Sequence, residues 1–217
     1  MSAPLTPSEE APGPACDSPR PLVAFDFDGT LTIRDSFTGF LAWRTTPARW
    51  AVGLARLAPS ALAYLGHRDR GRIKAAAIRW FLGGLPRARL AAEAEAYAEA
   101  RTAALLRPDA LAAWNAWRAR GAVLAIVTAS PTAVVGPFAR KLGADILIGT
   151  ELAYDGQDRV TGALATPNCR AAEKVVRLRE RFGDAVRLAA AYGDTSGDTE
   201  MLALAEAPGF RVFTGRP

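Results

Sequence analysis

The chain has 217 residues, of which 50% are hydrophobic and 23% are charged, and its mean hydropathy is +0.04. These values are typical of a soluble globular protein and exclude collagen-like, coiled-coil and wholly disordered chains. The two cysteines, Cys16 and Cys169, lie far apart in the sequence, so we expect no disulfide framework and a reducing, cytoplasmic setting.

The net charge of +5 is concentrated in one segment. Residues 36–90 contain ten Lys or Arg and a single acid, Asp69, so this segment is +9 and the rest of the chain is −4. A basic segment of this kind suits a phosphorylated substrate or peripheral contact with an anionic membrane, although it is also typical of a solvated helical face. No base-reading motif or stacking platform is present, and we therefore expect no nucleic-acid partner.

Residues 1–20 are rich in proline and contain no apolar run, which predicts a disordered tail rather than a secretory leader. The first apolar run, residues 22–25, predicts a buried strand. Residues 35–120 are dominated by Ala, Leu, Arg and Trp, which predicts four or five helices. Within them, residues 48–65 are nearly long enough to span a bilayer, but Arg49, Arg56 and Pro59 interrupt the stretch, so we expect a packed or surface-lying helix.

After Gly121 the pattern alternates between strands and helices, which predicts a parallel sheet covered on both faces. Asp155-Gly156 between two short β-permissive runs predicts a hairpin. The expected strands are 122–127, 145–148, 186–192 and 210–213, and the expected helices are 131–142, 168–182 with Asn168 as its cap, and 199–206.

Polar side chains follow three of the expected strands. Asp26 and Asp28 follow the first, Thr128 follows the second, and Asp194 follows the strand at 186–192. Because the carboxyl ends of parallel strands meet at one edge of a sheet, we expect these side chains to lie close together. Crowded carboxylates repel each other unless a cation lies among them, and an all-oxygen ligand set favours Mg²⁺.

Four motifs together resemble those of the haloacid dehalogenase (HAD) superfamily. Residues 26–32 (DFDGTLT) resemble its first motif, residues 127–130 (VTAS) its second, Lys174 its third and residues 193–198 (GDTSGD) its fourth. The helical block resembles the cap of the phosphoserine-phosphatase-like branch, subfamily IB, and other fragments resemble its phosphatidylglycerophosphatase-type members. The resemblance implies an α/β fold: a three-layer Rossmann-like core (21–35 and 121–217) with a parallel sheet and an inserted all-helical cap (36–120).

The resemblance also implies catalytic roles. Asp26 would be the nucleophile that forms an aspartyl-phosphate, and Asp28 the general acid and then the base. Thr128 and Lys174 would stabilise the phosphoryl group, although Arg170 lies four residues from Lys174 on the same helix face and is an alternative cation. Asp194 would ligate Mg²⁺ together with Asp26 and the Asp28 backbone carbonyl, with Asp198 supporting the ligands. Substrate contacts are implied for Gly29, Thr30, Asp35, Ala129, Ser130 and Arg170.

The expected enzyme is therefore a Mg²⁺-dependent phosphomonoesterase. Two substrate classes stay open. Asp35, where phosphoserine phosphatases have a Glu, suits a small ester such as phosphoserine, whereas the apolar and basic segment at 48–65 suits a lipid phosphate. A third hypothesis is a non-catalytic lipid- or partner-binding protein on the same scaffold.

Overall fold

A computed structural model describes residues 20–67 and 70–217, so the expected tail and Cys16 lie outside the described residues. A five-stranded sheet forms the centre of the molecule, in the order β3-β2-β1-β6-β7. Every neighbouring pair in it is parallel. The strands are β1 (Leu22–Phe25), β2 (Val123–Pro131), β3 (Ile146–Thr150), β6 (Leu188–Gly193) and β7 (Ala205–Phe210).

Strand β1 lies in the middle of the sheet, and all four of its residues are apolar. Val23, Ala24 and Phe25 are fully buried, as is expected of a strand covered on both faces. Phe25 lies opposite Ile126 of β2 and Tyr192 of β6. The residues that follow these three positions therefore emerge together at the carboxyl edge of the sheet.

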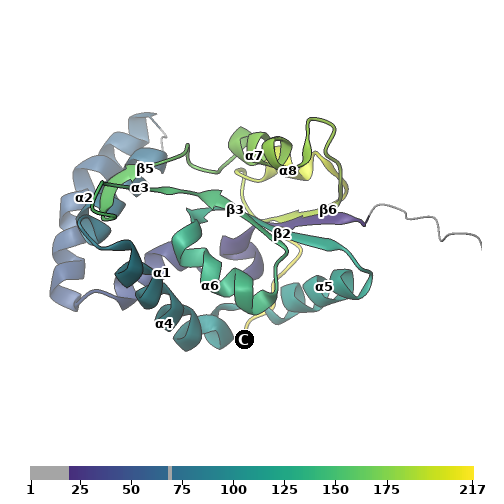
Figure 1. Cartoon of the computed structure of the whole chain (residues 1–217), viewed down its shortest axis with the longest axis horizontal. Helices are drawn as coiled ribbons and strands as arrows, with labels where there is room; N and C mark the ends of the chain where they lie inside the picture. The colour runs from purple at the N-terminus through teal and green to yellow at the C-terminus, as the bar shows by residue number, and fades with distance from the viewer. Residues whose placement is uncertain (1–19, 68–69) are drawn as a thin grey trace, which may run out of the picture.

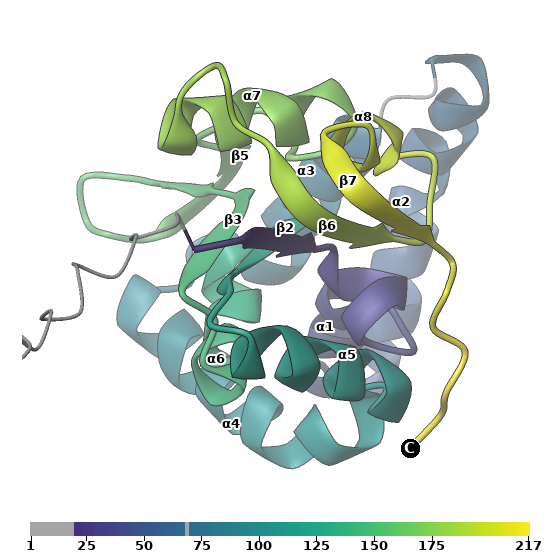
Figure 2. The ribbon, with the colours of Figure 1, turned by 90° about the vertical axis from the view of Figure 1, so that its right-hand side faces the viewer.

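Helices cover both faces of the sheet, which confirms the three-layer α/β prediction (Figures 1 and 2). On one side lie α1 (Ser36–Trp43), α4 (Arg87–Leu105), α5 (Pro108–Ala119) and α6 (Thr132–Leu142). On the other lie α7 (Ala172–Phe182) and the short α8 (Thr199–Leu202). Trp114 of α5 and Phe138 of α6 are almost fully buried against the strands and fix the first of these layers.

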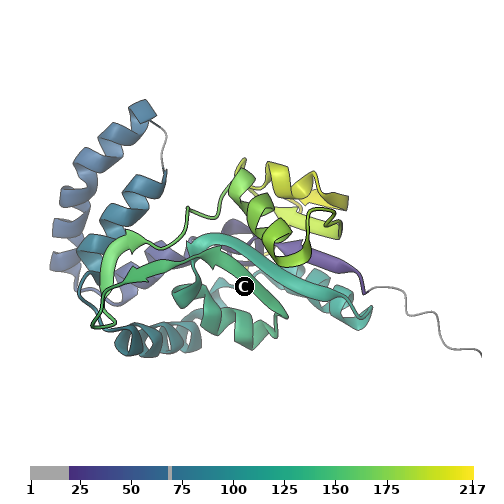
Figure 3. The ribbon, with the colours of Figure 1, turned by 45° about the horizontal axis from the view of Figure 1, so that its top comes forward.

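Two helices, α2 (Pro47–His67) and α3 (Arg70–Leu82), stand away from the sheet (Figure 3). The hairpin of β4 (Leu152–Tyr154) and β5 (Val160–Leu164) contacts α3. Gly53 lets α2 and α3 approach closely, because a Cβ there would lie 2.2 Å from the Phe81 ring. Residues 36–120 thus form five helices in the described ranges, of which α1, α4 and α5 lie beside the sheet. The division into core and cap at residues 36 and 120 stays an interpretation.

Helix α2 runs through Pro59, where the sequence predicted an interruption. An interior proline removes one backbone hydrogen bond, and the packing of α2 on α3 offsets that loss. In the part of the chain that the structure describes, none of the helices is sufficiently long and apolar to cross a membrane.

The C-terminal prediction was wrong in detail. Helix α8 ends at Leu202 instead of Glu206, and β7 spans Ala205–Phe210 instead of 210–213. Local composition (Ala, Leu, Glu) favours a helix there, but pairing with β6 overrides it, since Ala205 lies opposite Leu188 and Phe210 opposite Gly193. Pro208 is tolerated because β7 is an edge strand.

The start of α7 also differs from the prediction. The helix begins at Ala172, not Asn168, and Ala171 before it has a positive φ of 56°. The Asn168 side chain is engaged elsewhere, because its Oδ1 accepts hydrogen bonds from Lys74 Nζ (2.8 Å) and Thr150 Oγ1 (3.3 Å). The predicted end of this helix at Gly183 and the hairpin at Asp155-Gly156 are confirmed.

Candidate active site

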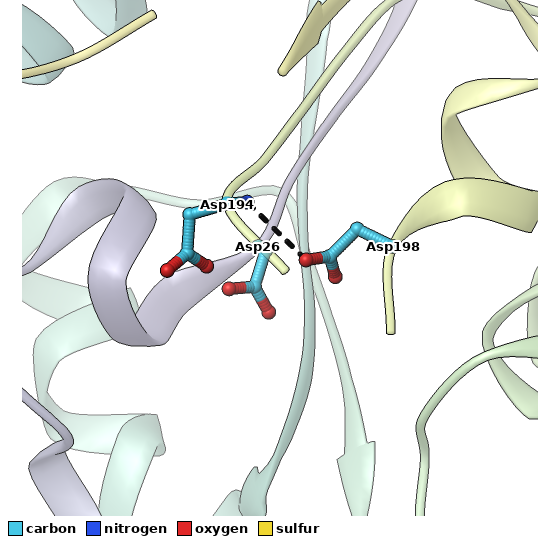
Figure 4. A group of neighbouring side chains, drawn as sticks. All are labelled: Asp26, Asp194 and Asp198. Carbon is cyan, nitrogen blue, oxygen red and sulfur yellow. Dashed lines mark hydrogen bonds between the residues drawn. The ribbon is translucent and has the colours of Figure 1, made fainter. Parts of the chain in front are cut away.

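Three carboxylates meet at the carboxyl edge of the sheet (Figure 4). Asp26 follows β1, Asp194 follows β6, and Asp198 directly precedes α8. Among the described residues, these three each offer an oxygen within 4.8 Å of the others. Asp26 and Asp198 are buried, which makes their mutual repulsion costly unless positive charge is close.

Lys174 supplies part of that positive charge. The lysine is 1% exposed, and its Nζ donates to Asp26 Oδ1 (2.6 Å), Asp198 Oδ1 (2.7 Å) and the Val127 carbonyl (2.6 Å). All three ammonium protons therefore have an acceptor. The ammonium group holds the Asp26 carboxylate in one orientation at the end of β1.

The pKa values reflect this burial. Burial raises the pKa of Asp26 to about 7, against the opposing charge of Lys174. Burial would lower the pKa of Lys174, but Asp26 and Asp198 outweigh it and the pKa is raised. Burial would raise the pKa of Asp198, but the charge of Lys174 and the hydrogen bonds from Lys174 and Thr195 leave this pKa below its ordinary value. Asp194 has a raised pKa because of burial and the charge of Asp198.

The donor set fits a divalent cation bound mainly by Asp26 and Asp194. Both oxygens of Asp198 are engaged, Oδ1 by Lys174 and Oδ2 by the backbone N–H and the hydroxyl of Thr195 at 3.0 and 3.1 Å. Within the described residues, the Asp194 carboxylate accepts only a long hydrogen bond from Thr30 Oγ1 (3.4 Å), which also reaches Asp26 Oδ2 at 3.4 Å. Oxygens on two neighbouring carboxylates are thus open to a hard cation such as Mg²⁺.

Asp28 lies outside this acidic cluster. Its Oδ1 accepts from the Ser36 backbone N–H (2.6 Å) and its Oδ2 from the Ser130 hydroxyl. Burial, followed by the charge of Asp35, raises its pKa to about 6. A carboxyl group with such a pKa exchanges a proton readily near neutrality, as acid–base catalysis requires.

The last residues of β2, which runs on to Pro131 and does not end at Val127 as the sequence predicted, place polar groups beside Asp26. Thr128 is fully buried, and its Oγ1 accepts from the Ser130 backbone N–H (3.0 Å). The Ala129 carbonyl accepts from Thr150 Oγ1 (2.7 Å), which fixes this end of β2 to the end of β3. Thr128, Ala129 and Ser130 line the same cavity as Asp26, Asp28 and Lys174, so the structure brings the predicted residues of three motifs together.

Gly29 is required by the close approach of Asp194. It has a φ of +84°, and a Cβ there would lie 2.2 Å from Asp194 Oδ2. We predict that Gly29→Ala lowers the free energy of unfolding by about 1–3 kcal/mol and turnover by at least about tenfold, because both the backbone strain and the clash displace Asp194. Gly156→Ala is the matched control, since a Cβ at Gly156 meets nothing within 4 Å. Thermal unfolding of both variants checks the prediction, and equal effects would contradict it.

The chain matches the family model of the haloacid dehalogenase-like hydrolases over residues 23–203. It belongs to this family. The match covers the four motifs and most of the sheet that carries them, which confirms the superfamily prediction. The protein is therefore an enzyme of the HAD hydrolase type.

Known proteins of similar sequence and fold agree with this assignment. The hydrolase is 59% identical over 196 residues to Protein CicA of Caulobacter vibrioides, covering 90% of this chain and 88% of that protein. A Bordetella pertussis protein of unknown function matches with a TM-score of 0.74 at 23% identity, covering 88% and 89% of the two chains. A phosphoserine phosphatase with a phospho-aspartyl intermediate analogue matches with a TM-score of 0.58 at 19% identity, covering 87% and 85%. The two structural likenesses show a shared fold.

Two residues proposed to contact substrate lie at the rim of the site of this HAD hydrolase. Arg170 donates to Ser196 Oγ at 3.1 Å and lines the cavity, whereas Lys174 is the cation bonded to Asp26. Asp35 lines the cavity as well, but its Oδ1 caps α1 by accepting from the Thr38 N–H at 2.6 Å.

Sequence reasoning missed Lys74 and Asn168. Lys74 of α3 reaches the site and donates to the Ala129 carbonyl and to Asn168 Oδ1. Burial lowers its pKa to about 8, although Asp35 and Asp28 oppose the shift. In the sequence Lys74 is the single lysine among the ten basic residues of its segment, which by itself does not predict a site. Its hydrogen bonds to groups at the end of the sheet do.

Proposed function

We propose that the protein is a Mg²⁺-dependent phosphomonoesterase that works through an aspartyl-phosphate on Asp26. The observation that carries this proposal is the position of the Asp26 carboxylate, which Lys174 holds at 2.6 Å beside Asp194, with a second carboxyl, Asp28, outside the acidic cluster. Nucleophile, cation and acid–base group are thus separate residues in one cavity of about 190 Å³.

In the first step the Asp26 carboxylate attacks phosphorus and the bond to the leaving oxygen breaks. Asp28 donates its proton to the leaving alkoxide. In the second step Asp28 accepts a proton from water as that water attacks phosphorus, which releases inorganic phosphate and restores Asp26. A bound Mg²⁺ would supply positive charge that offsets the phosphoryl oxygens and the carboxylates.

The other residues stabilise charge and position. The buried Thr128 hydroxyl donates to a phosphoryl oxygen, and the Lys174 ammonium offsets the charge that develops on the transferring group. Asp198 orients Lys174 through its 2.7 Å hydrogen bond. Ala129, Ser130 and Arg170 line the cavity around the phosphoryl group, where Arg170 attracts the anion. Gly29 and Thr30 lie beside Asp194 and position that carboxylate.

A small polar ester such as phosphoserine is the first candidate substrate. The cavity is small and mostly lined by polar and charged side chains, and Asp35 at its edge offers a carboxylate to an amino group. The phosphoserine phosphatases among the similar folds support the same class. An amphiphilic phosphate ester is the second candidate, because an apolar cavity adjoins the polar one.

A panel of phosphate esters tests the proposal, with phosphoserine, a sugar phosphate, a nucleotide and a lysophospholipid phosphate assayed for released phosphate. We predict turnover that chelator abolishes and added Mg²⁺ restores, since Asp26 and Asp194 have oxygens open to the cation. Asp194→Asn should raise the Mg²⁺ concentration needed for half activity by at least about tenfold. Glu200→Gln, an exposed acid on neighbouring α8, is the matched control. Turnover that chelator leaves unchanged would contradict the metal assignment, and no turnover of any ester would favour the non-catalytic hypothesis.

A further inference from the structure

A second cavity, of about 360 Å³, lies between α1, α2 and α3. Its walls are almost entirely apolar and come from all three helices. The apolar lining residues are Phe37, Leu41, Trp50, Leu54, Leu57, Ile73, Ala77 and Phe81. Open pockets of this size with mostly apolar walls are typical of ligand-binding sites.

This apolar cavity adjoins the phosphoryl site. Asp35 and Lys74 line both cavities, one from the start of α1 and one from α3. They are the only charged residues among those that line the apolar cavity within the described ranges. A molecule with its phosphate beside Asp26 would therefore pass between Asp35 and Lys74 before it met apolar walls.

Lys74 separates the two environments. Its Nζ donates to the Ala129 carbonyl and to Asn168, both on the side of the phosphoryl site, while the residue also lines the apolar cavity. A lysine commonly lays its aliphatic stem along apolar surface and keeps its amine among polar groups. The Lys74 amine thus lies where the polar end of a bound molecule would meet its apolar part.

The rim of the cavity is also apolar. Leu54 on α2 is 51% exposed, although it lines the cavity. Deeper in, Phe37, Leu41 and Phe81 are buried at 5% or less. The apolar lining is therefore exposed to solvent at the mouth of the cavity on α2 and buried at the end that adjoins the polar site.

We propose that the leaving alcohol of the substrate carries an apolar chain, which lies in the cavity between α1, α2 and α3 while the phosphate lies beside Asp26. The proposal rests on the phosphomonoesterase function. The apolar cavity would thus be the binding subsite of the leaving group. A polar leaving group such as serine would leave this apolar surface in contact with water.

The test is a series of n-alkyl phosphates, methyl, ethyl, butyl and hexyl, kept monomeric in solution and assayed with Mg²⁺. We expect kcat/KM to rise by about three- to fourfold for each methylene added until the cavity is filled, which is the value of burying a CH₂ group. Hexyl phosphate should therefore exceed phosphoserine. A parallel arm with phosphatidate vesicles identifies the source of the chain: faster turnover in vesicles assigns a membrane lipid, and faster turnover of the monomers assigns a soluble ester.

Two variants connect the chain-length effect to this cavity. Leu54→Gln at the mouth should lower kcat/KM for hexyl phosphate at least about threefold and leave methyl phosphate unchanged. Val52→Gln is its matched control, because Val52 is 48% exposed on the same helix and does not line the cavity. Ala77→Leu, which adds volume inside the cavity, should shorten the chain length at which kcat/KM stops rising.

The outcomes separate this proposal from the function it rests on. No turnover of any phosphate ester, phosphoserine included, would overturn the phosphomonoesterase. Turnover of phosphoserine but of no alkyl phosphate would overturn the apolar subsite alone. Turnover with equal kcat/KM along the series would overturn the apolar subsite and leave the phosphomonoesterase standing. A rise with chain length that Leu54→Gln and Val52→Gln reduce equally would place the chain elsewhere and also overturn the subsite.

Discussion

Asp26→Asn lowers turnover of every phosphate ester by at least about 10⁴-fold and leaves the protein folded. An amide cannot form the acyl-phosphate, so the first step is lost outright. The fold persists because Asn has the same shape and its Oδ1 can still accept from Lys174, as Asp26 does at 2.6 Å. Phosphate release measures the loss of turnover, and circular dichroism of the same preparation checks that the variant is folded.

Asp145→Asn is the control for this variant. Asp145 precedes β3 and lies at the opposite edge of the sheet, where its Oδ2 accepts from the Leu124 N–H at 2.8 Å. Its amide retains that acceptor, so turnover should stay within about twofold of the parent. Retention of full activity in Asp26→Asn would contradict the assignment of the nucleophile.

Lys174→Met produces the largest expected loss of stability. The variant leaves Asp26 and Asp198 buried and facing each other without their cation, which costs about 3–5 kcal/mol of unfolding free energy at neutral pH. Loss of the ammonium raises the pKa of Asp26, which burial already places at about 7, further above its unfolded value of 3.8. A carboxyl group whose pKa is higher in the folded state stabilises that state most below about pH 4, its unfolded pKa. This stabilisation is lost as the pH rises through the folded pKa. The deficit should therefore be largest near pH 8 and shrink toward pH 5.

Denaturant unfolding with chelator present, at pH 5 and pH 8, measures this deficit. Lys141→Met is the matched control, because Lys141 pairs with Glu99 on the surface, where the Glu99 side chain is 77% exposed. Such a pair contributes about 0–1 kcal/mol, with little dependence on pH in this range. Equal stability of Lys174→Met and the parent at pH 8 would show that the ammonium does not offset the two carboxylates.

The central features of the site could be predicted because they are local. Asp26 and Asp28 directly follow an apolar strand, and the parallel arrangement requires Thr128 and Asp194 to reach the same edge. The sheet and its two helical layers follow from the alternation of apolar strands and helices in the second half of the chain.

Features that depend on packing between distant segments could not be predicted. Strand β7 is fixed by its pairing with β6, against the local helical preference of Ala205 and Glu206. Asn168 was a plausible helix cap, but the fold uses its side chain to bind Lys74, 94 residues earlier in the chain. The apolar cavity depends on how α1, α2 and α3 pack together, which the pattern of any one helix does not determine.

The aspartyl-phosphate is tested most directly by rapid acid quench during turnover of a phosphate ester, followed by mass spectrometry of the peptides. The account predicts a phosphoryl group on Asp26, which disappears in Asp26→Asn and accumulates in Asp28→Asn, because that variant lacks the base that activates water. A phosphoryl group on another residue, or rapid turnover with none on the protein, would contradict it.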